Sequence, residues 1–473
     1  MINKYITATV LALITSNPVK SQPKRFYPKL VVNITIDQLR SDYIEDFYPF
    51  YGDNGFKKLL AGGTVYENVR YSFFPIDRAS SVASIMTGTS PSMNGITGST
   101  WLNKKSLFPV DCVEDDRYSS NTIPTPKNLL VTTVNDELKI ATDNKAIVFS
   151  IAKERDAAIM SGGHAADGAF WIDKDLKAWC SSSYYSKKIP NWLASYNSLY
   201  SNGFTENNIN SNITSVALQC IESTGMGLDE TPDMLSLTYD VKASENKTGL
   251  QLRNTYTGLD RELEKLISKI EQRLGADNVL FVVTSTGYCD EKEIDYDKYK
   301  IPNGTFYINR TTNLLNMYLG AIYGQDKYVE SCFYNQIFLN QELIEQKRIN
   351  ADELLSKAQS FLLLNEGVGD VYTSKDLILY RNSGNSKIGN WYNPNKCGDI
   401  VVEVYPGWKL LNEDNQQQYT SRANTVNFPI IFYGAGIGSA KITTPVTTDR
   451  IAPTVAKFIR IRAPNACNVE PLL

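Results

Sequence analysis

Imidazole, the side chain on which most zinc-dependent hydrolytic sites rely, occurs once among the 473 residues, at His164. A neutral ring nitrogen suits a borderline-soft cation such as Zn²⁺, and catalytic zinc sites commonly hold several histidines. One histidine cannot supply such a set. We expect His164, in the segment GGHAA, to be a structural residue held by packing or hydrogen bonds.

A carboxylate at the end of a buried strand is the second candidate for chemistry. Residues 30–36 (LVVNITI) form a continuous apolar run that stops at Asp37, which is typical of a strand buried on both faces. Residues 261–274 have helical spacing and precede a second buried strand at 279–284. In open α/β sheets, ligands bind beyond the carboxyl ends of the strands. Asp37 and the turn at 284–289 are therefore expected at one functional edge.

The order of these elements predicts an α/β fold with a doubly wound, mostly parallel central sheet flanked by helices. Further strand candidates lie at 147–151, 235–239, 400–404 and 430–433. Two stretches are predicted to be cap-like insertions on that sheet. They are residues 168–230, which are rich in Ser, Asn and Tyr, and residues 290–396, which mix polar loops with short helical patterns such as 352–363.

The N-terminal 21 residues have the layout of a cleaved secretory signal peptide, so we expect one mature domain over 22–473. The apolar run at 5–14 is shorter than the roughly 20 residues that span a bilayer, and no transmembrane segment is predicted. With 48 basic and 51 acidic residues, the chain shows no charge pattern for nucleic-acid binding. The expected location is the periplasm or the outer-membrane surface of a Gram-negative envelope.

Several ordered motifs resemble the alkaline phosphatase superfamily, in its nucleotide pyrophosphatase/phosphodiesterase branch and close to bacterial phosphate-irrepressible alkaline phosphatases. The resemblance runs from about Lys29 to the C-terminus and is weakest inside the expected insertions. The motifs are VVNITIDQLRSDY, GFKKLLAGGTVYENV, FFPIDRASSVASIMTGTSPSMNGITGSTW, GGHAADGAFWID, GDIVVEVYPGW, FPIIFYGAGI and TTPVTTDRIAPTVAKFIRIRAPNAC.

The resemblance implies a site with two zincs, three aspartates, three histidines and a threonine or serine nucleophile, which the metals activate. Asp37 matches the first metal aspartate. Arg78 stands at the nucleophile position, and a guanidinium cannot act as a nucleophile. The other five ligand positions match Ala243, Lys247, Thr286, Gly287 and a position near Gln418. We therefore expect the zinc site of the family to be lost, with no cofactor in its place.

The resemblance also implies three residues that hold phosphoryl oxygens in the monoesterase members. Lys153 and Arg155 match the basic pair, and Ser99 stands where the family has asparagine. A guanidinium and an ammonium both suit a phosphoryl group. The alternative is that Lys153 and Arg155 pair with local carboxylates such as Glu154 or Asp156.

A buried carboxylate is costly unless a cation compensates it. We therefore expect Arg78 to occupy the space that zinc takes in active relatives and to pair with Asp37, assisted by Lys247.

The function that these substitutions favour is a catalytically silent member of the superfamily, acting as a binding or scaffold subunit with protein partners in the cell envelope. One alternative is a phosphate mono- or diester hydrolase with an altered Ca²⁺ or Mg²⁺ site built on Asp37, Asp77 and Asp240. Another is a non-catalytic receptor for phosphate, sulfate or a phosphorylated glycan. The expected insertions are rich in tyrosine and asparagine, and they are either contact surfaces for a partner or ordinary cap elements over the former site.

Overall fold

The computed structural model describes residues 27–115, 123–173, 175, 177–199, 208–241, 249–289, 298–382, 386–414, 417–419 and 424–473. The predicted signal peptide at 1–21, Ala243 and Lys247 lie outside these residues. Within the described residues, no helix is long and apolar enough to cross a membrane.

The core of the fold is a nine-stranded sheet with the order β21-β2-β20-β10-β1-β9-β6-β7-β8. Its centre is parallel and comprises β10 (Val279–Ser285), β1 (Leu30–Asp37), β9 (Asp233–Asp240), β6 (Val148–Ala152) and β7 (Gly168–Asp173). The remaining strands are β8 (Ala178–Ser181), β20 (Ile430–Gly434), β2 (Thr64–Tyr66) and β21 (Ala440–Ile442). Strands β8 and β20 pair antiparallel with their neighbours. The predicted mostly parallel α/β sheet is confirmed.

Successive side chains along each strand point to opposite faces of this sheet and pack into two separate apolar cores. On β1, Val31 packs into one apolar cluster, whereas Leu30, Val32 and Ile34 pack into the other. A strand covered on both faces needs an apolar side chain at nearly every position. The mostly apolar composition of residues 30–36, in which the polar Asn33 and Thr35 are also buried, therefore has a direct structural cause.

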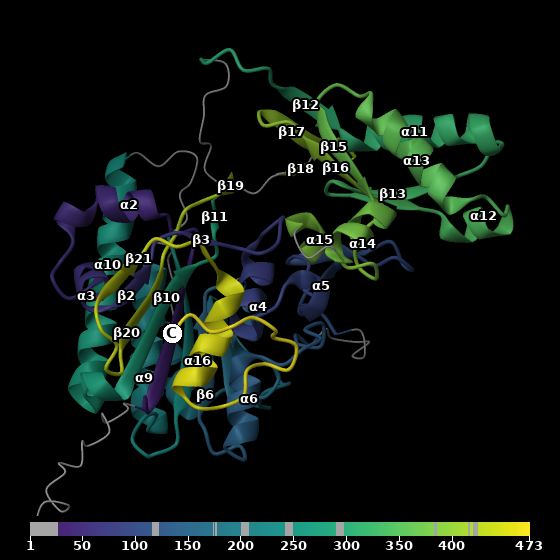
Figure 1. Cartoon of the computed structure of the whole chain (residues 1–473). Helices are drawn as coiled ribbons and strands as arrows, with labels where there is room; N and C mark the ends of the chain where they lie inside the picture. Colours follow the sequence, from purple (N-terminus) through teal and green to yellow (C-terminus); the bar gives the residue numbers. More distant parts are fainter. Residues whose placement is uncertain are drawn as a thin grey trace, which may run out of the picture.

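Helices cover both faces of the sheet. Helices α9 (Ile209–Thr224) and α10 (Gly249–Leu274) pack on one face through the cluster that holds Leu30. Helices α4 (Arg78–Thr87), α7 (Arg155–Gly162) and α16 (Ile451–Phe458) pack through the cluster that holds Val31. The predicted helix over 261–274 is the C-terminal half of α10. Figure 1 shows α10 and α16 on opposite sides of the strands.

A second lobe stands beside the main sheet and has its own apolar core (Figure 1). A four-stranded sheet in the order β13-β14-β16-β15 forms its centre, and β12, β17 and β18 form a smaller sheet. The strands are β12 (Gly304–Tyr307), β13 (Val329–Phe333), β14 (Gln336–Leu339), β15 (Val368–Thr373), β16 (Ile400–Val404), β17 (Trp408–Asn412) and β18 (Gln417–Tyr419). The helices are α11 (Ile308–Tyr323), α12 (Gln341–Gln346), α13 (Ala351–Leu363), α14 (Ser374–Asn382) and α15 (Lys387–Trp391).

The two expected insertions differ from the structure in their boundaries and in the part of the fold to which they belong. Residues 168–230 are largely part of the main domain, because β7 and β8 extend the central sheet and α9 covers it. The second lobe begins inside the expected 290–396 stretch but continues to β18, beyond residue 396. The strand expected at 400–404 belongs to this lobe as β16. An apolar run indicates a buried strand but not which sheet buries it.

Candidate active site

Asp37 lies where the sheet topology predicts a functional carboxylate. It ends β1, pairs in register with Asp240 at the end of β9, and has 5% of its surface exposed. Thr286, the residue after β10, donates its hydroxyl to Asp37 Oδ1 at 2.8 Å. The Thr286 oxygen in turn accepts the backbone N–H of Gln38 at 2.9 Å. The Thr286 hydroxyl therefore occupies one oxygen of Asp37.

Arg78 occupies the other oxygen of Asp37. It is the first residue of α4, and its Nη1 lies 3.5 Å from Asp37 Oδ2. Its Nε and Nη2 each donate to Asp156 at 3.0 Å, which gives the planar two-point contact that guanidinium and carboxylate favour. The Arg78–Asp37 pairing expected from the sequence is present, and Asp156 is a second, closer partner. We refer to Asp37, Arg78, Asp156, Ser99 and Asp77 as the Arg78 cluster.

The charges of the Arg78 cluster depend on one another. Burial raises the pKa of Asp37 to about 6; the Arg78 guanidinium opposes that rise, and Asp240 adds to it. Burial alone would lower the pKa of Arg78, but the charges of Asp156 and Asp37 outweigh it and raise that pKa above its ordinary value. Arg78 therefore stays protonated and keeps two buried carboxylates compensated.

The hydroxyl groups beside Arg78 are engaged in local structure. Asp77 caps α4 by accepting the backbone N–H of Ser80, and Ser80 Oγ donates back to Asp77. Ser81 Oγ donates to the carbonyl of Thr286 at 2.8 Å. Ser99 Oγ lies 2.8 Å from Asp77 Oδ2 and 3.1 Å from Asp156 Oδ2. Ser99 thus links the helix cap to the Arg78 cluster.

The two basic residues of the expected phosphate-binding pair also face carboxylates. Lys153 Nζ lies 3.5 Å from Asp240 Oδ2 and 4.0 Å from Glu154 Oε1. Arg155 Nη2 lies 2.7 Å from Asp111 Oδ2. Pairing with carboxylates is the arrangement that the alternative interpretation foresees, although Asp240 and Asp111 come from distant parts of the sequence.

The Gly287 position cannot hold an imidazole in this structure. Gly287 has a φ of +76°, and a Cβ built on it would lie 2.5 Å from the Tyr71 ring and 2.7 Å from the Phe428 ring. The Tyr71 hydroxyl donates to the carbonyl of Ser285 at 2.8 Å, which fixes the ring in place. Gln418 lies in β18 opposite Leu411. The structure describes its backbone and not its side chain.

These residues do not fit a two-zinc centre. The described residues contain no group of three or more His, Cys, Asp or Glu side chains arranged to hold a metal ion. Thr286 and Arg78 engage the two oxygens of Asp37, and an aromatic ring fills the space beside Gly287. The arrangement pairs charges and positions helix α4, and it offers no hydroxyl free to act as a nucleophile on the first turn of that helix.

The sequence points to Asp156 only as a possible partner of Lys153 and Arg155. Its position one residue after Arg155, in the first turn of α7, gave no sign that it faces Arg78. The contact arises because α4 and α7 pack side by side on the same face of the sheet. No local pattern points to Asp111, which pairs with Arg155.

His164 lies apart from the Arg78 cluster and both of its ring nitrogens have partners. Nδ1 lies 3.1 Å from Asp136 Oδ2, and Nε2 lies 3.0 Å from the carbonyl of Leu129. A carboxylate and a carbonyl are both acceptors, so the doubly protonated ring satisfies both contacts. This geometry is that of a structural histidine.

We expect His164 to titrate above its ordinary pKa of 6.5. Burial lowers the pKa of His164, but the hydrogen bond and charge of Asp136 outweigh burial and raise it. A raised pKa in the folded state adds stability that is complete below pH 6.5 and is lost as pH rises through the folded-state value. The stability advantage of the wild type over His164→Gln should therefore shrink as the pH is raised from below 6.5 into the alkaline range.

Because the chain has one histidine, its ring protons give a single titration curve in a ¹H NMR spectrum. Urea unfolding of both proteins across the same pH range supplies the stability difference. A midpoint at or below 6.5, or a stability difference independent of pH, would contradict this prediction.

Comparisons with known proteins agree with this fold. Residues 31–427 match the sequence profile of the family described as type I phosphodiesterase / nucleotide pyrophosphatase. Alkaline phosphatase PafA from Elizabethkingia meningoseptica is 24% identical, with 94% of each chain covered. A protein named calcium-transporting ATPase from Myroides odoratus is 27% identical, covering 98% of this chain and 97% of that protein. Alkaline phosphatase PhoV from Synechococcus elongatus is 25% identical over 93% of this chain and 91% of that protein.

Solved structures show the same architecture. The crystal structure of PafA superimposes with a TM-score of 0.81 at 23% identity, over 94% of this chain and 98% of that one. Murine ectonucleotide pyrophosphatase/phosphodiesterase 5 superimposes with a TM-score of 0.55 at 10% identity, over 92% and 95%. Likeness at these identities concerns the fold alone.

Proposed function

Because the chain belongs to the type I phosphodiesterase / nucleotide pyrophosphatase family, we propose that it keeps the family's fold while lacking the family's hydrolytic activity. In this proposal the protein is a binding or scaffold subunit of the cell envelope. Function depends on the residues of the site and not on the fold, so the Arg78 cluster is the relevant evidence.

One observation carries the proposal: the guanidinium of Arg78 lies between Asp37 and Asp156, at 3.5 Å and 3.0 Å. A metal ion supplies positive charge to such carboxylates in hydrolases and also activates a nucleophile. Arg78 supplies the charge but has no oxygen to activate, and it remains protonated at all working pH values. The cluster is therefore stable without being reactive.

Two further contacts support the same proposal. The serine hydroxyls next to Arg78 are held by the cap of α4 and by the carbonyl of Thr286. The Tyr71 ring lies against Gly287 and leaves no room for an imidazole there. The activity of an enzyme falls steeply when one member of its catalytic unit is removed. In this chain several residues that the resemblance implies for that unit are replaced.

Neither alternative function gains comparable support. A receptor for free phosphate or sulfate built on Lys153 and Arg155 would have to break the ion pairs with Asp240 and Asp111. A hydrolase with an altered metal site would need the carboxylate oxygens of Asp37, Asp77 and Asp240 to be available to the metal. Instead, Asp77 accepts the backbone N–H groups of Ser80 and Ser99, and Asp240 faces Lys153.

The second lobe is the surface on which we place the partner contact. Several large apolar side chains on it are exposed: Leu314, Met317, Leu363, Leu364, Ile378 and Leu379. They lie on α11, on α14 and at the end of α13, and exposed apolar side chains of this size are groups that a protein partner can bury. An envelope location is part of the proposal and rests on the signal-like sequence at 1–21.

Turnover measurements test the proposal. Purified protein, incubated with Zn²⁺, Ca²⁺ or Mg²⁺, is expected to release no p-nitrophenol from p-nitrophenyl phosphate or bis-p-nitrophenyl phosphate above the metal-only rate. Arg78→Thr, which restores a hydroxyl at the nucleophile position, is expected to stay silent because the imidazoles are still missing. An active relative such as PafA serves as the positive control in the same assay.

Metal analysis of the same preparations supplies the second readout, and we expect no stoichiometric zinc. Multiple metal-dependent turnovers by the wild-type protein, abolished by Asp37→Asn, would overturn the proposal in favour of an altered metal site.

A further inference from the structure

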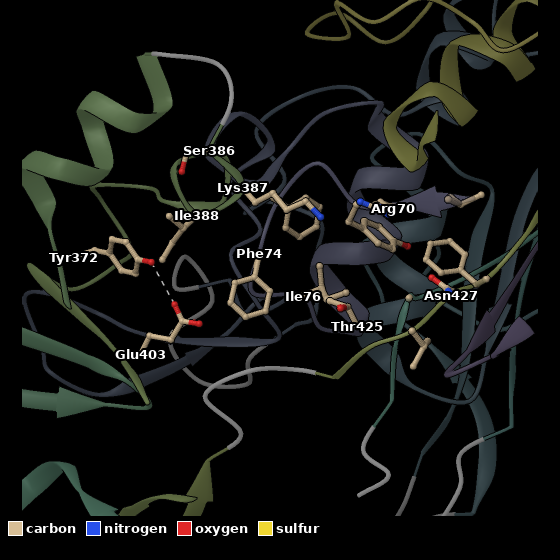
Figure 2. Close-up of a pocket in the computed structure, with 16 residues that line it drawn as sticks. Arg70, Phe74, Ile76, Tyr372, Ser386, Lys387, Ile388, Glu403, Thr425 and Asn427 are labelled. Atoms are coloured by element: carbon tan, nitrogen blue, oxygen red, sulfur yellow. Dashed lines mark hydrogen bonds between the residues drawn. The ribbon is translucent and has the colours of Figure 1, made fainter. Parts of the chain in front are cut away.

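A cleft between the main domain and the second lobe has no role in the function proposed above. It encloses about 600 Å³; Gly287 and Tyr71 line it, and no residue of the Arg78 cluster does. One wall is the segment 69–76 and the other is formed by Tyr372, Glu403 and residues 386–388 (Figure 2). A concavity of this size is in the range of small-molecule sites.

Two cations face this cleft, and neither pairs with a carboxylate of the described residues. They are Arg70, at the end of strand β3 (Val69–Arg70), and Lys387, the first residue of α15. Figure 2 shows the Lys387 ammonium directed toward the Arg70 side chain. Partial burial and the charge of Arg70 both lower the pKa of Lys387. Like charges held together without a counter-charge make a place where an anion is favoured.

The floor of the cleft beside these cations is apolar. Phe74 is half-buried, and Ile76 and Ile388 lie near it in Figure 2. The Tyr372 hydroxyl donates to Glu403 at 3.3 Å, and this polar pair lies across Phe74 from Lys387. The cleft therefore has a cationic end, an apolar middle and an acidic end.

The two walls are already joined, so the cleft is preformed. Phe74 N–H donates to the carbonyl of Lys387 at 3.0 Å, and the Asn390 side-chain amide donates to the carbonyl of Ser72 at 2.9 Å. A ligand that enters a preformed cleft does not have to order its walls, which reduces the entropic cost of binding.

We propose that this cleft binds a small amphipathic anion, with a carboxylate or phosphoryl-type oxyanion held between Arg70 and Lys387 and an apolar body on Phe74, Ile76 and Ile388. The site is separate from the Arg78 cluster and requires neither hydrolysis nor metal. A ligand function of this kind adds to the proposed scaffold role and does not depend on it.

Binding of four probes tests the proposal by isothermal titration calorimetry. Benzylphosphonate and 3-phenylpropionate carry the two kinds of oxyanion on an aromatic body, benzyl alcohol lacks the charge, and inorganic sulfate lacks the body. We expect saturable binding of at least one aromatic anion, with benzyl alcohol and sulfate at least about tenfold weaker. The tighter of the two aromatic anions identifies the head group.

Variants of the two cations give the decisive contrast. Arg70→Gln and Lys387→Met are each expected to weaken the aromatic anion about tenfold or more, because each removes a charge-assisted contact. Neither should lower the melting temperature of the free protein, since these side chains have no carboxylate partner to lose among the described residues. Arg348→Gln, an exposed arginine of the second lobe, is the matched control and should leave affinity unchanged.

Phe74→Ala should weaken both aromatic anions and leave the weak sulfate signal unaltered. The proposal is overturned if no aromatic anion binds at millimolar concentration, or if binding survives both cation substitutions. Because none of the probes is a hydrolysable ester, this result is independent of the turnover assay. Phosphatase activity would refute the proposed function and leave the cleft proposal standing.

Discussion

Replacing Arg78 with methionine is expected to lower the free energy of unfolding by about 3 kcal/mol, measured by urea denaturation at pH 7. The substitution keeps most of the side-chain volume but leaves Asp37 and Asp156 as buried carboxylates without a cation. Side-chain exposures of 7% for Asp37 and 9% for Asp156 mean that water cannot replace the guanidinium. Removing one partner from a buried ionic group typically costs this much.

Two controls make that result specific. Arg310→Met removes a two-point ion pair with Glu413 in which the arginine side chain is 63% exposed, so a much smaller loss of stability than for Arg78→Met is expected. Combining Arg78→Met with Asp37→Asn and Asp156→Asn removes the uncompensated charges and should recover most of the stability. If Arg78→Met is as harmless as Arg310→Met, Arg78 does not replace the charge of a metal.

Replacing Asp136 with alanine is expected to destabilise the protein by about 3 kcal/mol, the second large effect. One oxygen of Asp136 accepts the backbone N–H groups of His164 and Ala165, at 2.7 and 2.8 Å. The other accepts the backbone N–H and the hydroxyl of Thr133 and lies 3.1 Å from the His164 ring. Each buried donor left without an acceptor adds about 1 kcal/mol or more.

The comparison with His164→Gln tests what the single histidine does. Glutamine keeps the backbone N–H that Asp136 accepts and removes only the ring contacts, so a loss of about 1 kcal/mol is expected. A larger loss from His164→Gln than from Asp136→Ala would show that the ring, and not the carboxylate, organises this loop. Turnover assays on the same two variants should show no activity in either.

The positively charged side chains of the Arg78 cluster and of the cleft have different roles. In the Arg78 cluster, the guanidinium forms ion pairs with two buried carboxylates, those of Asp37 and Asp156. In the cleft, Arg70 and Lys387 face each other without such partners among the described residues. The first arrangement stabilises the fold, and the second leaves charge available for a ligand.

Local sequence was sufficient for the central strand that ends at the site and for part of a helix that covers the sheet. The apolar run at 30–36 predicted β1 and the place of Asp37, and the helical spacing at 261–274 predicted the C-terminal half of α10. It failed for the insertions, because residues 168–230 as a whole are rich in Ser, Asn and Tyr, like a loop region, yet their strands β7 and β8 extend the main sheet. Strand β16 was recognised as a strand, but nothing in it identified the sheet to which it belongs.

By itself, the sequence determined that this protein has one imidazole, an arginine where the family resemblance implies the nucleophile, and a carboxylate at the end of an expected strand. These are facts about residue type, and they limit the chemistry whatever the fold. Only the tertiary structure decided that Arg78 pairs with Asp156, 78 positions away, and that Arg70 and Lys387 share a cleft. Such contacts depend on how helices and lobes pack, and packing is a property of the whole chain that no local pattern encodes.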